Sequence, residues 1–301
     1  MNKIARTPEA LRGWFGFLVL ATCISSALSC ADTGQERVDI PLYLAGTSVT
    51  GPVSAVGGLA VTIESADLAF GPLYLCAGNT AGDLCETARL EWLDTAVVDT
   101  MDDSAMAVGK VSGVTGSVRS WMYDLGISSQ LTRPEPYVLE AAKDLGDASF
   151  VIEGSVLISG VELPFSAKVP IEQKDTNELG IPVIRKGSQS KFFHEVTGTE
   201  QRLTLSFDAS VWVSHIDFLP YLEDADCGSS DAVIVCDEQV ELTCDLDASV
   251  VERRDCSEMG QVCVKGRGCI DELVLEEGSE TYRSLAIALT TTGRPTFMWT
   301  E

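Results

Sequence analysis

Residues 149–169 read Ser-Phe-Val-Ile-Glu-Gly-Ser-Val-Leu-Ile-Ser-Gly-Val-Glu-Leu-Pro-Phe-Ser-Ala-Lys-Val. On both sides of Ser159-Gly160, large apolar side chains recur at every second position. This period of two is typical of strands with one buried face, and Ser-Gly between two such runs favours a tight turn. We therefore expect an antiparallel β-hairpin here.

Further runs of strand-forming composition lie before and after this hairpin: Val38–Leu44, Leu59–Glu64, Ala66–Phe70, Leu73–Cys76, Ala88–Leu93 and Leu203–Phe207. Glycine and proline separate these runs, as they do between the short strands of sandwiches and barrels. We find no alternation of strands with helices and no phosphate-binding glycine loop. The sequence therefore predicts an all-β fold, mainly an antiparallel sandwich or barrel, in a domain over residues 38–222.

One helix is predicted near the C-terminal end, from Glu280 to Thr291. Ser279 is a cap residue, Gly293 supplies a stop, and one helical face is apolar, with Tyr282, Leu285, Ala286 and Leu289. Thr296–Trp299 then predicts a closing strand. We expect the segment 272–301 to pack back on the β-domain.

Residues 1–29 have the features of an export signal. A basic start (Lys3, Arg6 and Arg12) precedes an apolar run from Trp14 to Leu28. The run is short for a spanning helix and suits a signal peptide. It ends in Ala27-Leu28-Ser29-Cys30, which resembles a bacterial lipobox with Ala27 in place of the usual leucine.

Cys30 has two interpretations. It is either the lipidated first residue of the mature chain, or an unpaired or intermolecular cysteine of a secreted protein. Eight cysteines remain after it, an even number that can pair completely: Cys76, Cys85, Cys227, Cys236, Cys244, Cys256, Cys263 and Cys269. We favour lipidation, with residues 30–37 as anchor and tether. Ala31 is not the aspartate of an inner-membrane retention signal, so we expect the outer membrane.

The cysteines divide into a local pair and a cluster. Cys76 and Cys85 enclose eight turn-forming residues, so we expect a disulfide between them. Six more, from Cys227 to Cys269, lie in a segment poor in large apolar residues, so residues 223–271 are predicted to form a module stapled by three disulfides. Zinc is the competing interpretation, but at least five residues separate neighbouring cysteines, too many for the cysteine pairs of zinc ribbons.

The stretch Cys256-Ser-Glu-Met-Gly-Gln-Val-Cys263-Val-Lys-Gly-Arg-Gly-Cys269 resembles small cysteine-rich modules in lipoproteins of myxobacteria and related deltaproteobacteria. The stretches Phe70–Cys76 and Arg294–Trp299 are similar to uncharacterised lipoproteins of the same bacteria. The resemblance implies location and architecture, and it implies no activity.

The charge of the chain limits its partners. There are 45 acidic and 21 basic side chains, for a net charge of −24. Nucleic acids and anionic lipid surfaces attract basic patches, so we expect no nucleic-acid partner and contact with the membrane through the lipid alone.

Catalytic motifs are not found. His194 is expected in an exposed loop. Ser214, His215 and Asp217 have the residue types of a triad, but the alternation of residues 211–217 predicts a strand that turns Ser214 away from His215. We therefore predict no catalytic residues and no enzyme.

Two candidate binding features remain. Glu223, Asp224 and Asp226 at the junction with the cysteine module offer oxygen ligands for calcium, although they do not match an EF-hand loop; the alternative is a solvated acidic linker, and no other cofactor is expected. Trp121 and Tyr123 are the candidates for a ligand surface, whereas aromatic residues at strand spacing are more often core.

The sequence therefore predicts an exported cell-envelope lipoprotein with a binding or structural role. An envelope hydrolase acting on glycan or peptide and a calcium-stabilised adhesin are the alternatives. The partner in the envelope or outside the cell is unknown.

Overall fold

The computed structural model describes residues 35–79, 85, 88–128, 137–138, 145–146, 148–170, 185–188, 191–222, 234–244 and 249–301. The chain divides into two compact units, residues 1–36 and 37–301. Nearly all of the described residues belong to the second unit, and the fold below is that of this unit.

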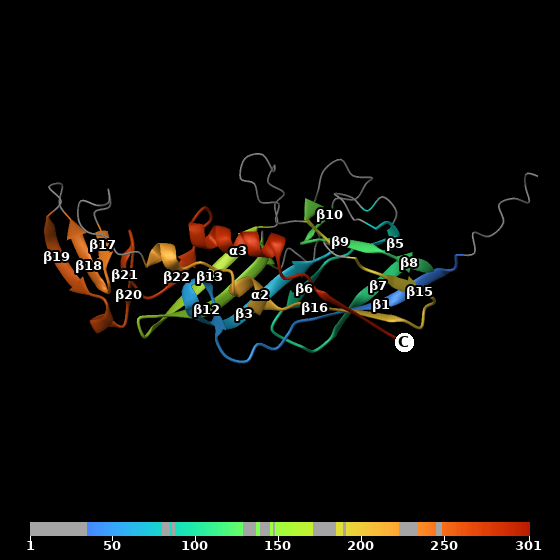
Figure 1. Ribbon diagram of the computed structural model, residues 1–301, viewed down its shortest axis with the longest axis horizontal. Helices are drawn as coiled ribbons and strands as arrows, with labels where there is room; N and C mark the ends of the chain where they lie inside the picture. Colours follow the sequence, from blue (N-terminus) through green and yellow to red (C-terminus); the bar gives the residue numbers. More distant parts are fainter. Residues whose placement is uncertain are drawn as a thin grey trace, which may run out of the picture. The chain divides into compact units, whose positions relative to one another are not determined.

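Two large β-sheets make up the body (Figure 1). The first has eight strands in the order β14 (Arg185–Gly187), β9 (Ser120–Asp124), β4 (Leu73–Cys76), β5 (Ala88–Trp92), β7 (Met106–Val114), β1 (Arg37–Ala45), β16 (Arg202–Ser206) and β23 (Thr296–Thr300). The second has β2 (Val53–Ser54), β3 (Ala60–Phe70), β12 (Ala148–Ile158), β13 (Val161–Pro170) and β22 (Leu273–Leu275), with β6 (Ala96–Asp99) beside β3.

Smaller elements complete the body. Two short strand pairs are β10 (Ile127–Ser128) with β11 (Tyr137–Val138), and β8 (Gly116–Val118) with β15 (His194–Val196). The α-helices of the described residues are α2 (Ala209–Val213) and α3 (Glu280–Thr291). The 3-10 helices described are η1 (Val56–Gly58) and η3 (Leu219–Tyr221) in the body and η4 (Ser257–Met259) in the cysteine-rich segment.

One core joins the two sheets. Leu42 of the first sheet and Phe150 of the second belong to the same buried cluster, together with Trp212 of α2 and Leu285 of α3. In the part of the chain that the structure describes, the strand pairs are antiparallel except for β1 with β16 and β13 with β22. The predicted all-β class, mainly antiparallel, is confirmed.

The hairpin at residues 149–169 forms as expected. Ile158 pairs with Val161, which leaves a two-residue turn. Ser159 and Gly160 both have positive φ, 50° and 83°, as the favoured two-residue hairpin turn requires. The inward side chains of β12 and β13 are buried, so the apolar residues that alternate in the sequence are the ones that face the core.

The C-terminal helix also matches its prediction. The Ser279 hydroxyl accepts a hydrogen bond from the Tyr282 N–H at 3.2 Å, and the predicted apolar face is buried. The chain turns at Gly293 with φ +60°, where a Cβ atom would lie 1.7 Å from the Trp212 ring nitrogen. Only glycine fits this turn. β22 before the helix and β23 after it extend the two sheets of the body, beside β13 and β16 respectively.

The strand predicted over residues 211–217 is wrong. The chain forms the short helix α2 (Ala209–Val213) because the Asp208 carboxylate accepts a hydrogen bond from the Ser210 N–H at 2.9 Å and caps its first turn. Trp212 and Val213 are buried together, as a helical turn allows and an alternating strand does not.

The cysteine-rich segment builds its own small sheets (Figure 1, orange). β17 (Ile234–Asp237), β18 (Val240–Cys244) and β19 (Val250–Asp255) form one, and β20 (Val262–Val264) pairs with β21 (Gly268–Ile270). Val262 and Val264 belong to the main core, and the Lys265 N–H donates to the Tyr221 carbonyl at 3.1 Å. The module is therefore attached to the body by packing as well as by the chain. Among the described residues no helix is long and apolar enough to span a membrane.

Candidate functional site

The cysteines of the described part of the chain are all disulfide-bonded. Cys76 pairs with Cys85, which confirms the local bridge. Within the module Cys236 pairs with Cys263 and Cys256 with Cys269, and Cys244 is also bonded. Cys30 and Cys227, and the calcium candidates Glu223, Asp224 and Asp226, lie outside the described residues.

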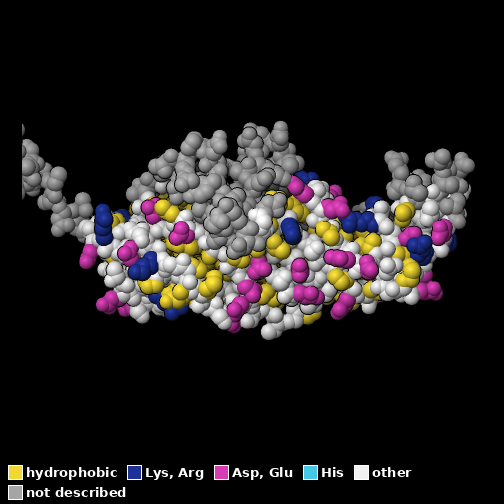
Figure 2. Space-filling model, turned by 180° about the vertical axis from the view of Figure 1, so that it is seen from behind, with side chains coloured by type: hydrophobic (Ala, Val, Ile, Leu, Met, Phe, Trp, Pro, Cys, Tyr) yellow, Lys and Arg dark blue, Asp and Glu magenta, His cyan; other side chains and the backbone are white. Residues whose placement is uncertain are grey.

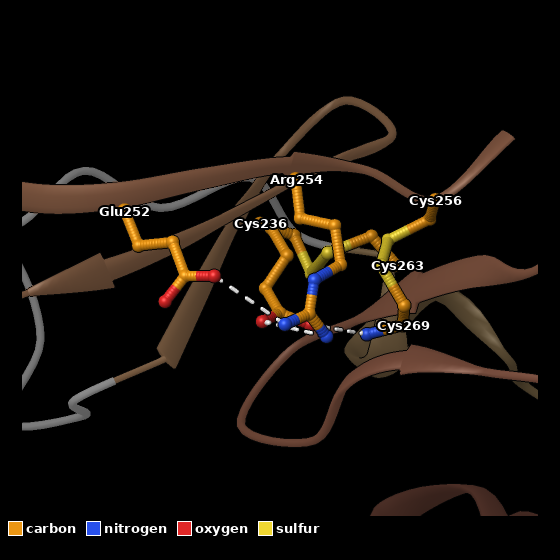
Figure 3. Close-up of polar contacts among 7 residues, drawn as sticks. Cys236, Glu252, Arg254, Cys256, Cys263 and Cys269 are labelled. Carbon is orange, nitrogen blue, oxygen red and sulfur yellow. Dashed lines mark hydrogen bonds and ion pairs between the residues drawn. A yellow bond between two sulfur atoms is a disulfide. The ribbon is translucent and has the colours of Figure 1, made fainter. Parts of the chain in front are cut away.

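The module has a buried carboxylate on β18, that of Glu241. Figure 3 shows its partner Arg254 with Glu252, and the Cys256–Cys269 disulfide. Glu241 is 8% exposed, and its Oε2 accepts a hydrogen bond from the Cys269 N–H at 2.7 Å. Its Oε1 lies 3.9 Å from Nη1 of Arg254, which also pairs with Glu252 at 3.4 Å. The Glu241 carboxylate therefore holds the β20–β21 hairpin against β18.

The same carboxylate lies close to two cysteine sulfur atoms, as a metal ligand would, but these sulfur atoms cannot bind a metal. A carboxylate oxygen of Glu241 and the sulfur atoms of Cys256 and Cys269 lie within 4.8 Å of one another. Metal binding needs thiolates, and these two sulfur atoms are joined to each other. The arrangement is structural, because it satisfies a buried backbone N–H where little apolar core exists.

Trp121 and Tyr123, the predicted ligand surface, are core residues, and that prediction is wrong. They are 5% and 1% exposed. Their rings stack at 5.6 Å between centroids, and Trp121 also stacks on Phe297 at 5.0 Å. Both point inward from β9, and burial raises the pKa of the Tyr123 hydroxyl far above its ordinary value. Met122 between them packs on the other face against the Cys76–Cys85 bridge.

Ser214 and His215 do contact each other, contrary to the strand-based expectation. Ser214 Oγ lies 3.1 Å from His215 Nδ1. However, His215 Nδ1 lies 2.7 Å from the Val211 carbonyl, which only accepts, so Nδ1 carries a proton. A protonated Nδ1 is no base toward the serine. The Asp217 carboxylate accepts from the Leu219 N–H instead of orienting the imidazole, so these residues do not form a triad.

His194 is half-buried rather than an exposed loop residue. Its ring stacks on Trp299 with centroids 3.8 Å apart and planes 9° apart, and its Nε2 lies 3.3 Å from Nε2 of Gln201. Burial lowers the pKa of His194, and the neighbouring Glu195 opposes part of this shift.

A group of carboxylates spans the second sheet. Asp67 of β3 pairs in register with Asp99 of β6. Burial raises the pKa of Asp67, and the charges of Asp99 and Glu153 add to the shift. These three carboxylates lie outside the pocket that the first sheet carries.

The outer face of the first sheet carries a hollow of about 480 Å³. It is lined by Arg37, Val38, Asp39, Glu91, Ser112, Gly113, Val114 and Thr199. Arg37 and Asp39 are outward residues of β1, because Val38 between them is in the core. Strand β7 supplies the floor and β5 the opposite wall. Thr199 comes from the loop between β15 and β16.

Cross-strand pairing arranges the charges of this hollow in rows. Ser112 of β7 is paired with Asp39 of β1 on one side and with Glu91 of β5 on the other. The Ser112 hydroxyl donates to the Asp39 carboxylate at 2.7 Å. One row along β7, Val114 is paired with Arg37. The hollow therefore has two carboxylates in one row and a guanidinium in the next.

Gly113 brings the strands together at the floor. It pairs with Leu90, and a Cβ at this position would lie 2.0 Å from the Arg89 carbonyl oxygen. A side chain here would force β5 away from β7, so the close packing of the two walls depends on glycine.

No local sequence pattern identifies these lining residues as a site. The alternation of charges at Arg37 and Asp39 marks an outward strand face, but the hollow requires knowledge of which strands lie next to each other. Residues 39, 91 and 112 come from three separate runs, and no local pattern specifies their pairing.

The fold and the hollow define a disulfide-stapled, mainly β protein with an open, polar depression on one sheet. No protein-family model matches the chain, and no curated protein matches it. Among solved structures, MbnP from Methylosinus trichosporium is distantly similar, at 14% identity and a TM-score of 0.30 over 57% of this chain and 76% of that one.

Proposed function

We propose that the chain is an exported, lipid-anchored protein of the cell envelope, of the lipoprotein class that its cysteine-rich stretch resembles. It binds a partner or ligand at the surface of its β-body. The main support for export is that the described cysteines are disulfide-bonded, since disulfides persist in oxidising compartments. The basic, apolar and small-residue order that ends at Cys30 supports the anchor.

The hollow on the first sheet supports a binding role. It collects charged and hydroxyl side chains from three strands and a loop around one space. Binding sites are concave and place a few polar groups so that they converge. A hydrolase needs an activated nucleophile or a pair of positioned acids, and the Ser214–His215 contact supplies neither.

Mass spectrometry of the membrane-extracted protein tests the anchor. We expect an N-terminal Cys30 that carries acyl chains, and we expect Cys30→Ala to lose the lipid. Cys23→Ala is the matched control, because Cys23 lies within the predicted signal and leaves with it. An unmodified N-terminus in the wild type, or acylation that survives in Cys30→Ala, contradicts the proposal.

A further inference from the structure

The charges around the hollow are opposite in sign and separate from each other. Arg37 is exposed, and within the described part of the chain no carboxylate lies within 4.0 Å of its guanidinium. Glu91 likewise has no ion-pair partner there. Asp39 is held by the Ser112 hydroxyl instead of a cation. Both signs of charge are therefore available to a ligand.

This local balance differs from the whole molecule, which has a net charge of −24. Figure 2 shows acidic side chains outnumbering basic ones on the face that it displays. A strongly acidic surface favours cations in general. A hollow that places a guanidinium one row away from two carboxylates instead favours a ligand that carries both signs itself.

The spacing between the rows indicates how far apart the ligand's charges are. Arg37 and Asp39 are two residues apart on β1, which is about 7 Å along a strand. In a free amino acid the ammonium and the carboxylate belong to one residue, so they lie closer together than this spacing. An extended dipeptide places its two ends about 7 Å apart, because each residue spans about 3.3–3.6 Å.

We propose that the hollow binds a short peptide with both termini free, the size of a dipeptide. Its carboxylate pairs with Arg37, and its ammonium lies between Asp39 and Glu91. Backbone groups of such a ligand have Ser112 and Thr199 beside them as polar partners. A volume of about 480 Å³ is within the usual range of small-molecule sites. This inference deepens the proposed function, because it assigns a ligand class to the same surface.

Calorimetric titration of the full mature chain at low salt with diglycine tests the site. N-acetyl-diglycine lacks the ammonium, and diglycine amide lacks the carboxylate. We expect saturable binding of diglycine and at least a roughly tenfold weaker affinity for each blocked form, because each loses a charge-assisted contact. Absence of saturable binding, or equal binding of the three compounds, overturns the proposal.

Variants assign the two ends. Arg37→Gln should bind diglycine and diglycine amide equally weakly, and Glu91→Gln should lose most of the preference for a free ammonium. Lys110→Gln, on β7 but outside the lining, and Glu162→Gln, on the second sheet, are the charge-matched controls and should bind as the wild type does. Wild-type affinity in Arg37→Gln overturns the proposal.

The outcomes separate this inference from the proposed function. An acylated Cys30 without diglycine binding removes the ligand class and leaves the envelope location. Diglycine binding by a protein that is never acylated removes the location and leaves the site.

Discussion

Gln201 and His194 fix each other's hydrogen-bonding roles. The Gln201 amide oxygen accepts from the Thr197 N–H at 3.1 Å, so its nitrogen is the donor toward the Glu195 carbonyl at 3.3 Å and toward His194 Nε2. His194 Nε2 is therefore an acceptor, and the ring is neutral with its proton on Nδ1. A second proton on the ring would place two donors face to face next to Trp299.

This contact predicts a loss of stability in acid. Burial lowers the pKa of His194 below its ordinary 6.5, so the unfolded chain binds the additional proton more readily than the native one. The stabilisation is complete above pH 6.5 and is lost as the pH falls through the lowered pKa. In His194→Phe, which keeps a ring on Trp299, we expect the free energy of unfolding to fall less between about pH 7.5 and about pH 5.5.

Denaturant unfolding at the two pH values measures this difference. An unchanged pH dependence in His194→Phe would show that other groups cause the acid sensitivity.

At the level of elements, the β20–β21 hairpin depends on the space that Gly268 leaves. Gly266 and Gly268 both have positive φ, +75° and +77°. A Cβ at Gly266 meets nothing within 4 Å, whereas a Cβ at Gly268 would collide with the Glu241 carboxylate. A side chain at either glycine would therefore strain the backbone equally, but only a side chain at Gly268 would also collide with Glu241.

Alanine substitutions should separate these two effects. Gly266→Ala should cost about 1 kcal/mol from left-handed strain alone. Gly268→Ala should cost more, because it also displaces the carboxylate from the Cys269 N–H and leaves that group unpaired. Thermal unfolding of the full chain and hydrogen exchange at Cys269 provide the measurements. Equal destabilisation by the two variants would mean that Glu241 does not hold the hairpin.

Local sequence patterns predict these elements to different degrees. Alternation located β12 and β13 because their inward side chains, such as Ile152, Val156 and Phe165, are large, apolar and spaced two residues apart. It divided β3 into two runs because Glu64 is an extra residue where β3 pairs with β12, between Ser65 opposite Glu153 and Ile63 opposite Gly154. It failed at α2, where the Asp208 cap outweighs a strand-like composition.

For the whole molecule, the charge excess predicts a response to salt. With a net charge of −24 the native state repels itself, and salt screens this repulsion over about 10 Å at 0.1 M. We expect the midpoint of thermal unfolding to rise from about 0.01 M to about 0.15 M sodium chloride. Sodium chloride and potassium chloride at equal ionic strength should act alike, and a falling midpoint would mean that ion pairs outweigh the repulsion.

Pairing between strands that are distant in the sequence explains two features of the molecule that local sequence patterns do not predict. Trp121 and Tyr123 face the core because β9 lies between β4 and β14 with that face inward. The hollow exists because β7 lies between β5 and β1, which places residue 112 beside residues 39 and 91. Neither arrangement can be predicted from the sequence of a single strand, because both depend on which strands pair.

The position of β1 imposes an order on the biogenesis of the protein. This strand is the first of the body, yet it lies inside its sheet, parallel to β16, with Leu42 opposite Leu203. The far side of β16 is in turn completed by β23, with Leu203 opposite Trp299. A chain that emerges from its N-terminus therefore holds an incomplete sheet until β23 is delivered. Such long-range closure is slow, so the emerging chain exposes unpaired strand edges until β23 arrives. We expect a chaperone to be needed most during this period, because unpaired edges are prone to aggregation.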